Sequence, residues 1–318
     1  MRQSSSRPII SCVLVSIVAV NSSFLIIAQE PSDEDRALTG VEFVQLNPKE
    51  QFAYLRDSIA RFRDRTQNIS ATITSSSSSD YHDRFQISEN VFPPPESVDR
   101  FDFRRIGTSY WIAQHQSQVD AAVSRKREAS IEKYEATTDD LLTLAYDITP
   151  RFPVQQIIHT SHGPGKIIQV CFFARYMGGV DGSSDRIPAD LMERFLHAGN
   201  RGTVTSVDQK DGIVHVEFRS ETPSGRPETN TATFDLSKQG LITRMQITRW
   251  SSYNGVRVAV KKYDFQMHDF EEIDGVLIPT KISVSDALGA FVTVHIERIK
   301  NIKLNTLSPD DLKLPVPM

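Results

Sequence analysis

The sequence is poor in cysteine, with only Cys12 and Cys171 in 318 residues. Cys12 lies in an apolar N-terminal stretch that we expect to be removed, so the mature chain cannot form an intramolecular disulfide and needs a large core instead. The chain also lacks an excess of basic residues, because its formal net charge is −4. This charge argues against nucleic acid as a partner, since nucleic-acid binding requires a basic face.

Motifs for phosphate or metal binding are also missing. His159 and His162 stand beside a Gly-Pro-Gly-Lys segment, but Ile167 follows Lys166 where a phosphate-binding loop needs Ser or Thr. A zinc site would need further ligands with suitable spacing, and none lies nearby. We therefore predict no metal and no cofactor, and we interpret this segment as a surface loop before a core strand at 167–173.

Catalytic motifs are equally scarce. The chain has no Gly-x-Ser-x-Gly nucleophile elbow. Cys171 lies in an apolar run with no neighbour to lower its pKa, which is typical of a small buried hydrophobe. The acidic pairs at 139–140, 271–272 and 310–311 resemble caps or turns. We predict no catalytic residue and no enzyme, and an extracytoplasmic hydrolase remains an alternative because triads assemble across a fold.

The N-terminus resembles an export signal. Arg2 and Arg7 precede an apolar stretch that ends at Ala28, and an acidic segment follows. Cleavage after Ala28 would leave 34 basic and 40 acidic residues and a periplasmic or secreted protein. The alternative is an uncleaved membrane anchor, because the apolar stretch could just span a bilayer. We expect residues 1–28 to be a signal peptide, 29–45 a flexible acidic lead-in and 46–318 a single domain.

The domain should begin with an amphipathic helix. Asn47 can cap it, Pro48 suits its first position and Glu50 completes a capping box. Apolar residues then recur on one face up to about Thr66: Phe52, Leu55, Ile59 and Phe62. A strand should follow from Asn68. The serine run at its end is either a linker or the polar half of that strand, and we favour a strand that frays into a loop.

The middle of the chain predicts mixed elements. A hairpin is expected over 101–113 around Gly107-Thr108, and a strand over 130–137. Apolar residues spaced three and four apart predict a short helix after Thr138 that ends at Pro150. A second helix is expected over 188–198. Between about 118 and 200 the signals for secondary structure are weaker than in the rest of the domain.

From Arg201 onward the sequence reads as one antiparallel sheet. Apolar residues alternate with other residues in six segments, which indicates strands with one buried face. The segments contain Val214-Val216-Phe218, Ala232-Phe234-Leu236, Leu241-Met245-Ile247, Val256-Val258-Val260, Ile278-Ile282-Val284 and Val292-Val294-Ile296. Asp-Gly and Asn-Gly dipeptides between them favour tight hairpin turns. A large curved sheet of this kind must bury its apolar face against helices or around a ligand.

Short motifs in this order resemble a known family. They are the first helix, Tyr263-Asp264-Phe265, Gly275 to Ile282 with its Pro279, Asn301 to Asn305, and Leu312 to Pro315. Together they resemble the outer-membrane lipoprotein-sorting carriers of the LolA/LolB type, as a divergent member. The resemblance implies an α+β fold: a strongly curved antiparallel sheet, an unclosed half-barrel, with helices covering its concave face. It also implies binding of lipid or lipoprotein acyl chains without catalysis. The middle region, about 115–200, departs from the family pattern because it is longer.

The predicted function is therefore an exported, non-catalytic binding protein with an apolar ligand in a half-barrel cavity. The aromatic residues fill either the core or the wall of such a cavity. Candidate cavity residues are Phe52, Leu55, Ile59, Trp111, Phe218, Phe234, Met245 and Trp250. Expected partners are a lipid or lipoprotein acyl chain, or an envelope protein, with membrane contact only through the signal peptide or transiently. The alternative is an envelope interaction module whose core is filled by side chains.

Overall fold

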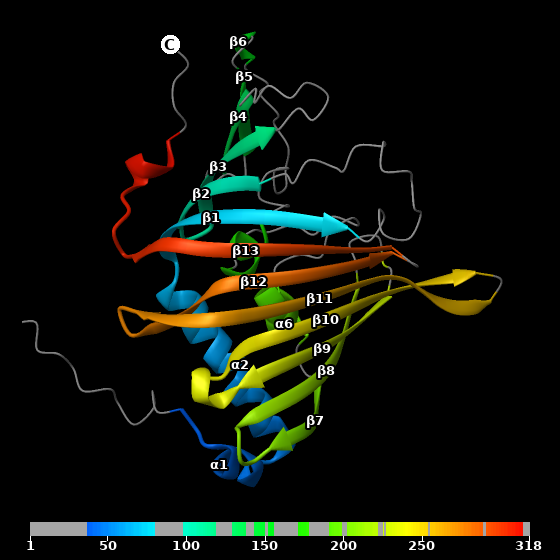
Figure 1. Cartoon of the computed structure of the whole chain (residues 1–318). Helices are drawn as coiled ribbons and strands as arrows, with labels where there is room; N and C mark the ends of the chain where they lie inside the picture. The colour runs from blue at the N-terminus through cyan, green and yellow to red at the C-terminus, as the bar shows by residue number, and fades with distance from the viewer. Residues whose placement is uncertain are drawn as a thin grey trace, which may run out of the picture. The chain divides into compact units, whose positions relative to one another are not determined.

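A computed structural model describes most of the domain. The described residues are 37–79, 98–118, 129–137, 143–149, 152–155, 171–177, 191–198, 202–221, 225, 227–253, 255–288 and 291–313. The helices are α1 (Gly40–Gln45), α2 (Pro48–Arg65), α5 (Phe172–Met177) and α6 (Leu191–His197), with 3-10 turns at Leu236–Lys238 and Pro309–Leu312 (Figure 1). The predicted signal peptide, residues 1–28, lies outside the described residues.

Thirteen antiparallel strands form one sheet in the order β6-β5-β4-β3-β2-β1-β13-β12-β11-β10-β9-β8-β7. Their bounds are β1 Asn68–Ser79, β2 Val98–Ile106, β3 Ser109–Gln118, β4 Ala129–Thr137, β5 Thr143–Thr149, β6 Phe152–Gln155, β7 Gly202–Asp208, β8 Ile213–Glu221, β9 Pro227–Asp235, β10 Leu241–Tyr253, β11 Val256–Ile273, β12 Val276–Leu288 and β13 Phe291–Leu304. In the part of the chain that is described, β6 and β7 are end strands and do not pair with each other. The predicted open antiparallel sheet is therefore confirmed.

Hairpin chemistry explains the tight connections in this sheet. Asp274 and Gly275 join β11 to β12, and both have positive φ angles, 50° and 74°. A two-residue turn with both central residues in this region matches the twist of the flanking strands. β1 runs unbroken through the serine segment to Ser79 and pairs with β13 along its length. The serines are thus the polar half of a strand rather than a loop.

Helix α2 forms as predicted. The Asn47 side chain accepts hydrogen bonds from Lys49 N (3.0 Å) and Glu50 N (3.1 Å), and Glu50 bonds back to Asn47 N (2.9 Å). Phe52 at one end of the helix lies against Gly202 of β7, where an added Cβ would collide with its ring. Arg65 at the other end lies against Gly275. The helix therefore crosses the sheet from β7 to the β11–β12 turn.

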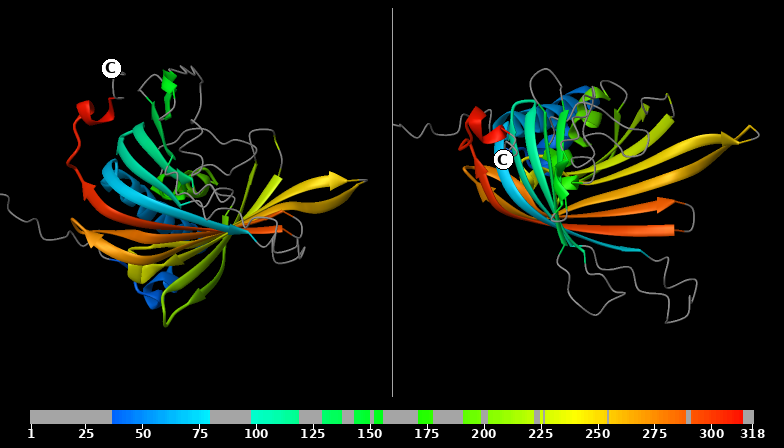
Figure 2. Two further views of the ribbon diagram at one scale, coloured as in Figure 1. Left: turned by 45° about the horizontal axis from the view of Figure 1, so that its top comes forward. Right: turned by 90° about the horizontal axis from the view of Figure 1, so that it is seen from above.

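Three helices cover one face of the sheet. Figure 2 shows the strands strongly twisted and bent around α2, α5 and α6, so that these helices lie on the concave face, as predicted. The main core lies between them and the inward side chains of the strands. The 3-10 turn Pro309–Leu312 lies on the other, convex face, where Leu312 packs against Trp111 and Ala113. Among the described residues, no helix is long and apolar enough to cross a membrane.

Three segments differ from the sequence prediction. The described part of the helix expected after Thr138 is instead β5, because residues 143–148 pair with β4. The prediction of a core strand at 167–173 is wrong at Phe172 and Phe173, where α5 begins, and 167–170 lie outside the described residues. Within the expected lead-in, α1 forms because Thr39 and Glu42 make a capping box, and it buries Phe43 completely. The predicted strand at 130–137 and the helix around 191–197 are confirmed.

Candidate functional site on the concave face

Six of the eight candidate cavity residues lie together on the concave face, on α2, β8, β9 and β10. We call this region the apolar half of that face. All six are at most 6% exposed and belong to the main core: Phe52, Leu55, Ile59, Phe218, Phe234 and Met245. Phe195 of α6 lies among three of their rings, with centroid distances of 5.0 Å to Phe52, 5.6 Å to Phe218 and 4.8 Å to Phe234. The structure thus brings these six residues together, and α6 supplies the side chain that lies over them.

The two tryptophans of the predicted cavity point the other way. Trp111 is buried on the convex face, beneath Leu312 and the guanidinium of Arg104, which lies 4.5 Å from its ring. Trp250 donates from Nε1 to the Thr229 hydroxyl (3.1 Å), and Thr229 is on the opposite side of β9 from the inward Glu228. Both residues are out of phase with their inward neighbours in the strand, so neither belongs to the concave face.

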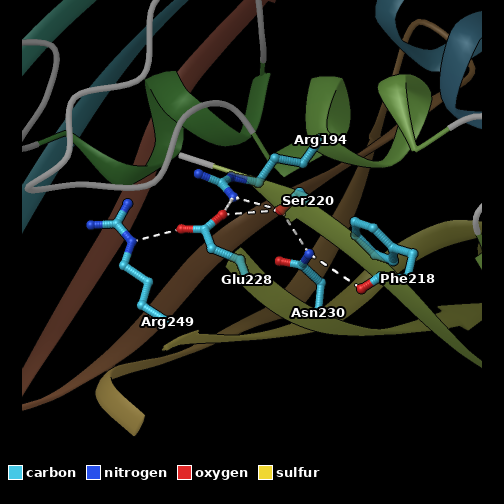
Figure 3. Close-up of polar contacts among 6 residues, drawn as sticks. All are labelled: Arg194, Phe218, Ser220, Glu228, Asn230 and Arg249. Atoms are coloured by element: carbon cyan, nitrogen blue, oxygen red, sulfur yellow. Dashed lines mark hydrogen bonds and ion pairs between the residues drawn. The ribbon is translucent and has the colours of Figure 1, made fainter. Parts of the chain in front are cut away.

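A buried polar cluster borders this apolar half. We define the Glu228 cluster as Arg194, Ser220, Glu228, Asn230 and Arg249 (Figure 3). Glu228 Oε1 accepts from Arg249 Nε at 2.6 Å, and Oε2 binds Arg194 and accepts from Ser220 Oγ at 3.0 Å. Asn230 Nδ2 donates to Ser220 Oγ at 2.9 Å. The cluster connects α6, which carries Arg194, to strands β8, β9 and β10.

The charge state of Glu228 follows from these contacts. Burial raises the pKa of a carboxyl group, but the charge of Arg194 and the hydrogen bonds from both arginines outweigh burial here, and the pKa of Glu228 is lowered. Glu228 is therefore an ionised, permanent acceptor rather than a proton-transfer group. Its side chain is completely buried, and the side chains of Arg194 and Arg249 are only 6% and 4% exposed. The arrangement suits the attachment of α6 to the sheet.

A second buried carboxylate holds α5. Glu297 of β13 accepts from the backbone N–H groups of Phe172 (2.9 Å) and Phe173 (2.7 Å) at the start of that helix. Burial raises the pKa of Glu297 to about 7, although the two backbone donors and Arg175 act in the opposite direction. Cys171 beside it is fully buried, and burial followed by the charge of Glu297 raises the pKa of its thiol. The predicted reading of Cys171 as a buried hydrophobe is confirmed.

A buried arginine joins the ends of two helices. Arg105 of β2 is 1% exposed and donates to the carbonyl of Thr66, after α2, at 2.8 Å. It also donates to the carbonyl of Met177, the last residue of α5, at 2.5 Å. A cation at the carbonyl end of a helix is favourable because the helix dipole is negative there. Arg105 therefore fixes the C-terminal ends of α2 and α5 on the concave face.

Sequence reasoning missed these charged residues. Glu228 and Asn230 are in phase with Ala232 and Phe234, and Arg249 is in phase with Ile247, so the strand alternation already places them inward. A charged residue at an inward position of a strand indicates a buried ion pair, and this signal was available in the sequence. Its partner could not be read from the sequence, because Arg194 comes from a separate helix.

The structure describes no metal centre. Among the described residues, no group of three or more His, Cys, Asp or Glu side chains could hold a metal ion. His159 and His162, the pair considered in the sequence, lie outside the described residues. Glu297 and Cys171 are fully buried, so neither offers a reactive group to a substrate in solution.

Comparisons with known proteins give a likeness in fold. No family model matches the chain, and no curated protein sequence matches it. The chain is similar to a DUF1329 family protein from Desulfovibrio piger, with 12% identity over 81% of this chain and 98% of that one and a TM-score of 0.44. It is also similar to a LolA superfamily protein from Nitrosomonas europaea (11%, 85% and 99%, TM-score 0.40).

A third similar structure is an outer membrane lipoprotein-sorting protein domain from Vibrio parahaemolyticus (9% identity, 81% of this chain and 95% of that one, TM-score 0.44). The last two structures belong to the group that the sequence resembles. The open-sheet fold of this chain follows from its own strand order, and no ligand or partner is taken from these similarities.

Proposed function

We propose that this protein is an exported, non-catalytic binding protein that holds an apolar ligand, a lipid or an acyl chain, on the concave face of its sheet. One observation carries the proposal: two very short helices lie over apolar side chains of that face. α5 has six residues and α6 has seven. Helices of this length are unstable on their own in water, so their position depends on their contacts with the sheet.

An apolar ligand could replace the apolar contacts that α5 and α6 make with the sheet. Phe173 and Phe195 bury their rings completely against the sheet and α2. An acyl chain offers the same apolar surface and could replace these rings. The charged contacts, Glu297 with α5 and Glu228 with Arg194 of α6, then decide how easily each helix leaves. The sheet itself is held by its own strand pairing and would persist.

Loosening α6 should therefore increase the affinity for an apolar ligand. In Arg194→Gln, Glu228 keeps its contact with Arg249, so we expect a folded protein that binds an apolar fluorescent probe about tenfold more tightly, because less free energy is needed to displace α6. Arg244→Gln is the matched control, since Arg244 forms an exposed ion pair with Asp264. Probe titration, together with mass spectrometry of organic extracts of the purified protein, provides the measurement.

The packed core supports a second function. Because α6 already fills the space over Phe52, Phe218 and Phe234, the protein could be an envelope interaction module with no small ligand. That function predicts that no lipid co-purifies and that the probe fails to bind both the wild type and Arg194→Gln. Such a result would reject the carrier proposal, and crosslinking in cells would then be used to identify a protein partner.

Export is part of the same proposal. The basic residues Arg2 and Arg7 and the apolar stretch up to Ala28 support cleavage and an extracytoplasmic location. Protein recovered from the extracytoplasmic fraction of a bacterial host should begin at Gln29. A chain that retains residues 1–28 and sediments with membranes would instead indicate an N-terminal anchor.

A further inference from the structure

The β10–β11 hairpin extends beyond its neighbours in the sheet. β10 pairs with β9 only as far as Arg249, and β11 pairs with β12 only from Lys262 onward. The two strands continue to pair with each other up to Tyr253 and Val256. We call residues 250–262 the ribbon; Figures 1 and 2 show it projecting past the ends of β12 and β13.

The ribbon exposes apolar side chains. Val256 is 62% exposed and Val258 is 44% exposed, although their alternation in the sequence predicts a buried face. They are two residues apart on one strand, so they share a face of the ribbon. Only one other large apolar residue in the described part of the chain, Val41, is comparably exposed. A two-stranded hairpin is at best marginally stable in water, which favours a contact that covers this surface.

The ribbon is also positively charged. It contains Arg257, Lys261 and Lys262 and no acidic residue, in a chain whose net charge is −4. Lys261 is paired with Asp286 at 3.0 Å. Lys262 and Arg257 are exposed, and the Arg257 guanidinium lies 4.4 Å from the ring centre of Trp250. Because side chains alternate along β11, the valines lie on one face of the ribbon, and Arg257 lies with Trp250 on the other.

We propose that the ribbon docks on the surface of an anionic lipid bilayer. The ribbon would enter the headgroup boundary tip first, so that both of its faces contact lipid and the valines bury apolar area that drives binding. Arg257 and Lys262 would meet the lipid phosphates, and Trp250 would lie at the level where tryptophan is enriched in membrane proteins. The charge of the ribbon is opposite to that of the lipid surface and to that of the chain as a whole. The ribbon begins directly after Arg249 of the Glu228 cluster, but the proposal does not depend on what the concave face binds.

Vesicle flotation tests this proposal. The chain from Gln29 onward is suitable, because the main core lies entirely between Phe43 and Leu304. We expect binding to vesicles of phosphatidylcholine with phosphatidylglycerol, weaker binding to phosphatidylcholine alone, and weakening by salt. The double variant Val256→Ser/Val258→Ser should bind at least about tenfold more weakly. Arg257→Gln/Lys262→Gln should bind about thirtyfold more weakly to the anionic vesicles.

Val41→Ser is the matched control, because it removes an equally exposed valine from α1, and it should bind as the wild type does. Unchanged thermal unfolding of all variants would show that the fold is intact. The proposal is wrong if the wild type does not float with anionic vesicles, or if Val41→Ser and Val256→Ser/Val258→Ser bind equally. A dimer that the double valine variant dissociates, without vesicle binding, would assign the ribbon to a second copy of the chain. Probe binding at the concave face should be unaffected by these variants.

Discussion

Replacement of Glu228 by glutamine is expected to lower the free energy of unfolding by about 3–5 kcal/mol, because it removes the carboxylate that two buried guanidinium groups bind. Glutamine preserves the shape of the side chain, so the loss reflects charge rather than volume. Arg194 and Arg249, at most 6% exposed, would lose their shared counter-charge, and the glutamine NH2 group would face one of the two guanidinium groups. Urea unfolding of the wild type and the variant measures the difference.

Asp264→Asn provides the control for this experiment. Asp264 accepts two hydrogen bonds from Arg244, at 2.8 Å and 2.6 Å, but the Arg244 side chain is 46% exposed. An exposed ion pair contributes about 1 kcal/mol or less, so this variant should remain close to the wild type. Equal stability of Glu228→Gln and Asp264→Asn would contradict the structural role of the Glu228 cluster.

Glu297→Gln is expected to change how stability depends on pH. The pKa of Glu297 is raised from 4.5 in the unfolded chain to about 7 in the fold, mainly by burial. Between these two values the folded protein retains a proton that the unfolded chain has released, so the stability of the wild type falls as pH rises. The total contribution is about 3 kcal/mol. The variant cannot ionise, and this fall should be absent from its urea unfolding curves measured across that pH range.

Two comparisons make the Glu297 result interpretable. Burial lowers the pKa of His295 on the same strand, so His295 makes the protein more stable as pH rises in part of this range. The variant retains His295, and the difference between the two pH profiles therefore reports on Glu297 alone. Glu271→Gln, at an exposed position of β11, should keep the wild-type pH dependence. Identical pH profiles of the wild type and Glu297→Gln would show that the carboxyl group titrates normally in the fold.

The sheet and α2 could be predicted from the sequence because their signals are local. Alternation with period two marks a strand that buries one face, and the Asn47-Pro48-Glu50 cap marks the start of a helix in any context. The spacing of Leu141, Leu144 and Ile148 predicted a helix, but Leu144 and Ile148 are also in phase for a strand. Pairing with β4 decides between them, and such pairing cannot be read from the segment itself.

The candidate site could be predicted only in part. Periodicity predicts the inward residues of α2 and of the strands. The aromatic character of Trp111 and Trp250 suggests a cavity wall, but both residues are out of phase with Ile112 and Ile247. The valines at 256 and 258 alternate as a buried face would, yet they are exposed because β9 and β12 end before them. Strand lengths relative to neighbours, and the charged contacts of α6, are properties of the assembled sheet.

Native-state hydrogen exchange of α5, α6 and α2 tests the removable helix cover most directly. If α5 and α6 leave the concave face while the sheet persists, amides at 172–177 and 191–197 should exchange through a local opening, far faster than those of α2 at 48–65. Addition of an apolar ligand should change exchange in α5 and α6 and leave the central strands unchanged. Exchange of all three helices at the single rate of global unfolding would contradict a removable cover and favour a permanently packed core.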